Sequence, residues 1–334
     1  MTSAKWMGFS LTSTEGSKSA CWGGGNMRST HPSTKTLTYR EYRRREHAFA
    51  LCLLLPTIIV FAVFMFWPVI YTFYLSVLKW NMISPNKVFV GLKNYRKIVN
   101  NAEFILVLKN TVFYLLLFII INVAVPYFIS YCITFLIKRL KQFYKVAIFV
   151  PSLISLVVGG LIMSWIWNSV AGPLATIWSF FGVKFPNWAT TSGLVIVVIA
   201  LVVSWKMFGY NLIVLVSAID SVPIELIETA RLEKTPNIEI FFKIVLPMTS
   251  ASGIYTLIIS MVWGLQWSYT PLNILTAGGP NNASTNIIFE VYEKAFSIFN
   301  VGEASALAVI ALFLFIVFLI LELKFVEKGV YYEN

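Results

Sequence analysis

Long apolar stretches are the feature that most constrains this chain of 334 residues. A helix needs about 20 mainly apolar residues to cross roughly 30 Å of hydrocarbon. Six stretches meet that requirement, near residues 48–78, 107–137, 146–168, 193–218, 248–270 and 303–324. A spanning β-barrel would instead show segments of about 10 residues with alternating polarity, and these stretches do not alternate. The pattern predicts an all-α membrane protein with six transmembrane helices.

Composition agrees with a location in the bilayer and excludes a soluble enzyme. Hydrophobic residues make up 58% of the chain and charged residues 12%, whereas soluble globular proteins carry about 45–50% and about 25%. The net charge of +11 would also suit a protein that binds nucleic acid. Such a protein, however, gathers its basic residues on one soluble face. Here the basic residues separate apolar stretches. We therefore expect membrane lipid around the chain and no nucleic-acid partner.

Lysine and arginine in the loops predict the orientation, because cytoplasmic loops carry an excess of them. With both termini in the cytoplasm, the cytoplasmic segments from Lys35 onward hold 14 of these residues and the opposite loops hold 7. The first outer loop departs from the rule. Its basic residues are Lys79, Lys87, Lys93, Arg96 and Lys97.

Residues 1–45 are rich in Ser, Thr, Gly and Lys and lack the apolar core of a secretion signal. We expect them to form a disordered cytoplasmic tail. Met27 leaves open whether the natural start lies later. The six-helix transmembrane domain is expected over residues 46–330.

Residues for catalysis or cofactor binding are missing from the sequence. It contains no GxxxxGK[ST] phosphate loop, no HExxH and no GxSxG. The two histidines are His31 and His47, and the three cysteines, Cys21, Cys52 and Cys132, lie far apart. We expect no enzyme activity, no catalytic residue, no metal site and no cofactor bound by this chain.

The segment 221–247 is too polar to span a membrane and too patterned to be a linker. Pro223 suits the first turn of a helix and Ser221 can cap it. Pro236 then ends the helix, because the residue before a proline disfavours helical geometry. A second short helix is predicted over 237–246. On pattern alone, a surface elbow with a solvated acidic face fits this segment as well.

Spacing within the segment resembles the Glu-Ala-Ala loop of the permease subunits of bacterial ABC importers. The resembling residues are Glu228, Thr229, Ala230, Arg231, Leu232, Glu233 and Lys234, with Pro247 beyond them. The family's separation of 19 residues between glutamate and proline is reproduced from Glu228 to Pro247. Two positions depart from the motif, Thr229 for alanine and Lys234 for glycine. Because glycine normally provides the left-handed turn after a helix, we expect the helix to run on past Lys234 to Pro236.

Other motifs resemble the carbohydrate-type permeases, relatives of the maltose and glycerol-3-phosphate importers. They are FVGLKNY at Phe89–Tyr95, Lys109–Thr111, LTAGGP at Leu275–Pro280, Ala295 with Phe296, and GEASA at Gly302–Ala306. The resemblance, in motif order and in spacing, extends over roughly residues 48–330. The resemblance implies a type I ABC importer permease architecture, with a cytoplasmic coupling helix between the fourth and fifth spans.

The resemblance also implies a function in the cell membrane, as half of a pathway for a sugar or oligosaccharide. The partners would be a second homologous permease subunit, two ATPase subunits that bind ATP and Mg, and an extracytoplasmic solute-binding protein. Residues 228–234 would contact the ATPase. A polyol phosphate or another small polar solute is the alternative within this class. An ATP-independent carrier or channel, which would transport without partners, is the alternative from another class.

Polar and aromatic residues interrupt two of the predicted spans, as in transporter sites near the bilayer midplane. They are Trp205, Lys206, Tyr210 and Asn211 in the fourth span, and Ser260, Trp263, Gln266 and Trp267 in the fifth. The helical spacing of the second group places it on one face. A sugar ring can stack on aromatic faces while its hydroxyls find polar partners. The resembling family lines its cavity from these two regions, although Trp and Tyr also gather at membrane interfaces without touching a solute.

Lys206 lies roughly midway along its predicted span, where a lysine costs about 2.5–3.5 kcal/mol unless it finds a partner. It can meet an anionic solute, or it can bind backbone carbonyls of the partner permease. We favour the structural contact.

Overall fold

The computed structural model describes residues 39–137 and 139–327. The predicted tail therefore lies largely outside the described residues. The first helix begins at Tyr39, within the range predicted as tail, because the Arg- and Glu-rich residues there are good helix formers. The chain divides into two units, residues 1–59 and 60–334, and the predicted boundary between residues 45 and 46 stays a prediction.

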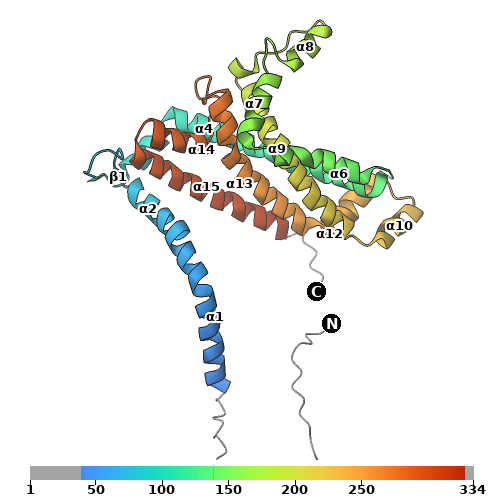
Figure 1. Ribbon diagram of the computed structural model, residues 1–334, viewed down its shortest axis with the longest axis horizontal. Coiled ribbons are helices and arrows are strands. Elements are labelled where there is room, and N and C mark those ends of the chain that lie inside the picture. Colours follow the sequence, from blue (N-terminus) through green and yellow to red (C-terminus); the bar gives the residue numbers. More distant parts are fainter. Residues whose placement is uncertain (1–38, 138, 328–334) are drawn as a thin grey trace, which may run out of the picture. The chain divides into compact units, whose positions relative to one another are not determined.

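Most of the described chain is helical (Figure 1). The helices are α1 (Tyr39–Phe61), α2 (Trp67–Ser76), α3 (Lys93–Val99), α4 (Ala102–Ile119), α5 (Val125–Tyr131), α6 (Lys141–Phe149), α7 (Leu156–Ile166), α8 (Pro173–Phe180), α9 (Leu194–Asp220), α10 (Ile224–Leu232), α11 (Asn237–Ile240), α12 (Leu246–Met248), α13 (Ser250–Leu275), α14 (Ile287–Tyr292) and α15 (Val301–Glu327). Short 3-10 or π-helical segments join them: η1 (Ala62–Phe66), η2 (Ile120–Ala124), η3 (Cys132–Leu136), η4 (Val150–Leu153), η5 (Trp188–Thr190), η6 (Phe241–Val245) and η7 (Glu293–Ser297). Two short antiparallel strands, β1 (Leu78–Lys79) and β2 (Val88–Phe89), pair Leu78 with Phe89.

The predicted all-α membrane class is confirmed. Four helical segments are long and apolar enough to cross a membrane: Phe49–Ser76, Ala102–Leu136, Leu194–Asp220 and Val301–Glu322. Two bent pairs raise the number to six if each pair is one span: Lys141–Leu153 with Leu156–Ile166, and Asn237–Met248 with Ser250–Leu275. The six predicted stretches fall on these segments.

The predicted third stretch, 146–168, is not one straight helix. α6 and α7 meet at an angle of 102°. Pro151 cannot donate a helical hydrogen bond, Ile154 is extended, and the side chain of Ser155 caps α7 by accepting from the Val158 N–H. The bend of 81° before α13 falls at Thr249, two residues after Pro247.

The main core lies between α4, α9 and α13. Tyr114 and Phe118 of α4 are fully buried and their rings stack with centroids 6.0 Å apart. Gly264 lets α13 approach them, because a Cβ there would lie 2.5 Å from the Phe118 ring. A second cluster surrounds Tyr131, where α10 and η6 pack against the ends of α5 and α9. The long spans and the polar segment between α9 and α13 are thus held by separate apolar clusters.

Candidate functional site

A row of aromatic rings, partly exposed, runs along α9 and α13. The hydroxyls of Tyr210 and Tyr255 lie 2.8 Å apart, and the Tyr210 and Trp263 ring centroids are 5.6 Å apart. Trp263 stacks on Trp267 with centroids 5.2 Å apart. We call Tyr210, Tyr255, Trp263 and Trp267 the aromatic stripe. Its rings offer apolar faces, and its hydroxyls and indole N–H groups can donate hydrogen bonds.

Tyr255 belongs to the aromatic stripe but is not among the residues predicted from the sequence. It lies eight residues before Trp263 on the same helix. Two helical turns separate the two residues, so they fall near the same face. That spacing was available in the sequence.

Lys206 is bound to backbone at the edge of the stripe. Its Nζ donates to the carbonyl oxygens of Ser152, at 2.8 Å, and Ile154, at 2.5 Å, and lies 5.7 Å from the Trp267 ring centroid. The bend between α6 and α7 frees these carbonyls from helical hydrogen bonds. These carbonyls belong to the same chain as Lys206, and the expected contact with a partner permease stays a prediction.

Gly209 brings the same bend close to α9. A Cβ at this position would lie 2.5 Å from the carbonyl oxygen of Ile148 and 2.8 Å from the Cα of Phe149. The backbone of α9 therefore touches the end of α6 directly. Together with Lys206, this contact holds the bend against α9.

Asn211 and Ser260 are fully buried and lie apart from the aromatic stripe. The Asn211 Nδ2 donates to the carbonyl of Asn122 and to the Ser260 Oγ, both at 2.7 Å. Ser260 Oγ donates in turn to the Thr256 carbonyl at 2.6 Å, and Asn122 Nδ2 donates to the Ser204 Oγ at 2.8 Å. We call these five residues the buried polar network. It joins η2, α9 and α13 by hydrogen bonds within the core.

The other two predicted pathway residues take different places. Trp205 lines a separate cavity of about 540 Å³ with Met163 and Phe208, and its ring lies 3.4 Å from the position of a Cβ on Gly159. Gln266 is exposed on α13. The spacing of the four fifth-span residues predicted that they share one helix face, but the structure places them in different surroundings. Ser260 points into the core, Trp263 and Trp267 are half-buried, and Gln266 is exposed.

The predicted coupling segment contains the helix α10, packed by one face onto the spans. Ile227 and Ala230 are buried beside Tyr131. The Arg231 guanidinium donates to the Phe135 carbonyl at 3.1 Å, at the end of η3. Glu228 is exposed. Displacement of this helix would be transmitted through these contacts to the helices that carry the spans.

Lys234 contradicts the expectation that the helix runs on to Pro236. α10 ends at Leu232, and Lys234 adopts the left-handed conformation with φ 60°. Its N–H donates to the Arg231 carbonyl, and the Thr235 N–H donates to the Ala230 carbonyl, both at 3.0 Å. This pair of bonds is the Schellman motif that usually contains glycine. The two satisfied carbonyls offset the backbone strain of a lysine.

Two sequence motifs that lie far apart in the chain meet in the structure. Asn110 Nδ2 donates to the carbonyls of Asn282, at 3.0 Å, and Thr285, at 3.1 Å. The Thr111 hydroxyl accepts from the Ile287 N–H at 3.0 Å. The loop after the LTAGGP motif is therefore fastened to α4 by side chains of the Lys109–Thr111 motif.

No family model matches the chain. The probable ABC transporter permease protein YurN of Bacillus subtilis is 29% identical over 283 residues, which cover 83% of this chain and 96% of that protein. The sn-glycerol-3-phosphate transport system permease protein UgpA of Pectobacterium atrosepticum is 25% identical over 281 residues, which cover 84% and 95%. The chain is thus similar in sequence to transport-system permease proteins over more than four fifths of its length.

Solved structures agree with this relationship at the level of the fold. The chain superimposes with a TM-score of 0.73 on a chain of a bacterial ABC transporter involved in the import of the acidic polysaccharide alginate, at 19% identity, covering 86% of this chain and 99% of that one. A second structure, of the alginate transporter in complex with alginate pentasaccharide-bound periplasmic protein, gives a TM-score of 0.71 at 18% identity. The ABC importer permease fold therefore extends over most of the chain.

Proposed function

We propose that this chain is a permease subunit of an ABC importer, forms half of the transmembrane pathway for a sugar or oligosaccharide, and is driven by separate ATPase subunits. The aromatic stripe carries the proposal. Its four rings lie along two helices of the membrane domain, with Tyr255 exposed and Tyr210, Trp263 and Trp267 half-buried. They carry hydroxyl and indole N–H groups that can bind sugar hydroxyls. A lipid-facing surface would not need the paired tyrosine hydroxyls.

A polyol phosphate is the second candidate, because several curated relatives are named as sn-glycerol-3-phosphate permeases. Lys206 is the basic group next to the aromatic stripe, and its ammonium already donates to two carbonyls of the chain. Binding an anionic group would therefore compete with these bonds. We rank a neutral sugar first for this reason.

The proposed coupling element is α10, with Glu228–Lys234 facing the ATPase. Glu228 is exposed and can accept a charge-assisted hydrogen bond from a basic group of that partner. The buried Ile227 and the Arg231 bond to Phe135 tie the helix to the spans. A movement of α10 would then reach α5 and α9.

The proposed assembly contains a second homologous permease, two ATPase subunits that bind ATP and Mg, and an extracytoplasmic solute-binding protein. The alginate transporter, whose structure includes a periplasmic protein, supports this last partner. We place the protein in the cell membrane with both termini in the cytoplasm.

A charge reversal on α10 tests the proposal. Glu228→Lys should leave the protein in the membrane but abolish uptake and solute-stimulated ATP hydrolysis in the reconstituted transporter. Glu225→Lys, one turn earlier on the same exposed helix, is the matched control and should retain most of both activities. Wild-type uptake by Glu228→Lys would overturn the coupling role. Transport by this chain without its partners would instead favour the carrier or channel.

A further inference from the structure

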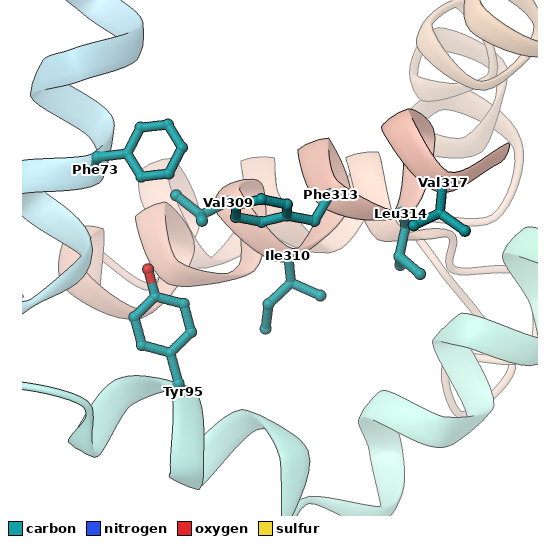
Figure 2. A pocket seen from close by; sticks show the side chains of 7 residues that line it. All are labelled: Phe73, Tyr95, Val309, Ile310, Phe313, Leu314 and Val317. Carbon is teal, nitrogen blue, oxygen red and sulfur yellow. The ribbon is translucent and has the colours of Figure 1, made fainter. Parts of the chain in front are cut away.

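A groove between α2 and α15 lies outside the proposed pathway. It has a volume of about 440 Å³ and is lined by Phe73 of α2, Tyr95 of α3, and the α15 face from Val309 to Val317 (Figure 2). Figure 2 shows the Tyr95 ring at one end of this groove, with the apolar α15 side chains extending away from it. Because the groove is almost wholly apolar, an acyl chain suits it better than a polar solute.

Two basic residues line a second depression, which shares Tyr95 with the groove. Lys93 and Arg96 lie three residues apart on α3, which puts them on neighbouring positions of one helix face. Together with Tyr95 and Val99 they line a shallow depression, and both are exposed. In the part of the chain that the structure describes, neither forms an ion pair. The depression therefore offers positive charge at the end of an apolar groove.

The other basic residues of this loop have partners, apart from Lys79. Lys97 bonds to Glu303 at 2.7 Å, and Lys87 donates to the Tyr71 hydroxyl at 2.7 Å while lying over the Trp80 ring. The excess of basic residues in this predicted outer loop departs from the usual distribution of charge. Of the basic residues in this loop, Lys93 and Arg96 are the two that lie beside the groove.

The corner that holds α3 is rigid. The Tyr95 hydroxyl donates to the Ser76 Oγ at 2.7 Å, and Asn94 Nδ2 donates to the carbonyls of Ser76, at 2.8 Å, and Leu78, at 2.9 Å. α3 lies between the end of α2 and the start of α4, both parts of candidate spans. It therefore sits where a span leaves the hydrocarbon, at the depth of lipid headgroups.

We propose that this corner binds an anionic phospholipid, with its phosphate at Lys93 and Arg96 and one acyl chain in the groove between α2 and α15. Basic residues at the membrane surface attract anionic headgroups, and apolar burial holds the chain. A helix of a partner protein fits the groove by shape, but an apolar helix gives no role to the two exposed cations beside it. The lipid accounts for both observations.

Native mass spectrometry of the full-length chain tests the proposal, with equal amounts of phosphatidylglycerol and phosphatidylcholine added. The wild type should retain phosphatidylglycerol in preference to phosphatidylcholine. Lys93→Gln and Arg96→Gln should each lower that retention about fivefold. Lys184→Gln, which removes an exposed lysine from another predicted outer loop, should leave it unchanged.

A second variant tests the groove separately from the charges. Val317→Trp, at a half-exposed position of the groove wall, should lower phosphatidylglycerol retention while both basic residues remain. Equal retention of the two lipids by the wild type would overturn the proposal, as would a wild-type preference in the Lys93→Gln, Arg96→Gln protein. The proposal would also be overturned if Phe313→Cys crosslinked to the second permease in an assembled transporter that holds no phosphatidylglycerol, because a protein would then occupy the groove.

Discussion

Neighbouring residues on α9 show how one pair of helices serves two purposes. Tyr210 belongs to the partly exposed aromatic stripe, where its hydroxyl lies 2.8 Å from that of Tyr255. Asn211, the next residue, turns into the core and bonds to Asn122 and Ser260. Successive residues on a helix are separated by about 100°, so polar residues adjacent in sequence face different surroundings. A polar residue within a span therefore does not by itself mark a solute pathway.

The buried polar network should dominate stability. Asn211→Leu removes two interhelical hydrogen bonds, and we expect the free energy of unfolding to fall by about 2 kcal/mol. Thermal unfolding in detergent measures this change. Tyr210→Phe is the matched control and should alter the melting temperature little, because its hydroxyl lies at the exposed side. Equal losses in both variants would break the comparison.

The aromatic stripe should dominate transport. Trp263→Ala should reduce uptake about tenfold, equivalent to about 1.4 kcal/mol, because it removes a ring face between Tyr210 and Trp267. Trp263→Phe keeps a ring and should recover most of the uptake. Initial rates in proteoliposomes, normalised to folded protein, measure the effect. Wild-type rates in Trp263→Ala would remove the stripe from the pathway.

Lys206 lies at the edge of the aromatic stripe and binds the backbone of the bend between α6 and α7. Lys206→Met frees the carbonyls of Ser152 and Ile154, and we expect a loss of about 1 kcal/mol in stability. Uptake should fall equally for a neutral sugar and for glycerol 3-phosphate, measured side by side. A selective loss of the anionic solute would instead make Lys206 a ligand.

The smallest effect is expected at the end of α10. A lysine in the left-handed conformation destabilises the folded state by about 1–2 kcal/mol. Glycine removes this strain, but its larger unfolded-state entropy lowers the free energy of unfolding by about 0.5–1 kcal/mol. Lys234→Gly should therefore raise the free energy of unfolding by about 0.5 kcal/mol, with uptake unchanged. Thermal unfolding checks the sign. Destabilisation by glycine would mean that the Lys234 side chain makes a contribution beyond its backbone conformation.

Much of the fold could be predicted because membrane spans are recognisable by length and hydropathy. The predicted stretch 193–218 matches α9 apart from Gly193, which precedes the helix, and 48–78 closely matches the apolar segment Phe49–Ser76. The bend between α6 and α7 was missed, because a proline in a membrane helix is compatible with a continuous span. The early end of α10 was missed because two backbone hydrogen bonds offset the strain at Lys234.

The candidate site could be predicted only in part. Helical spacing brought Trp263 and Trp267 together correctly, because that relation is local. It could not show that Ser260 turns inward, which depends on the position of Asn211 on another helix. The contact of Asn110 with Thr285 joins residues 175 positions apart, and no local pattern in the sequence encodes it.

Access of water to the aromatic stripe tests the central claim most directly. In a cysteine-free background, Trp263→Cys in the assembled transporter is treated with a water-soluble maleimide, with and without solute and binding protein. Val317→Cys on α15, at the proposed lipid groove, is the control. We predict that Trp263→Cys is modified, that solute slows its modification, and that Val317→Cys stays unmodified. A Trp263→Cys that is inert, or that reacts at the same rate with solute present, would contradict the account.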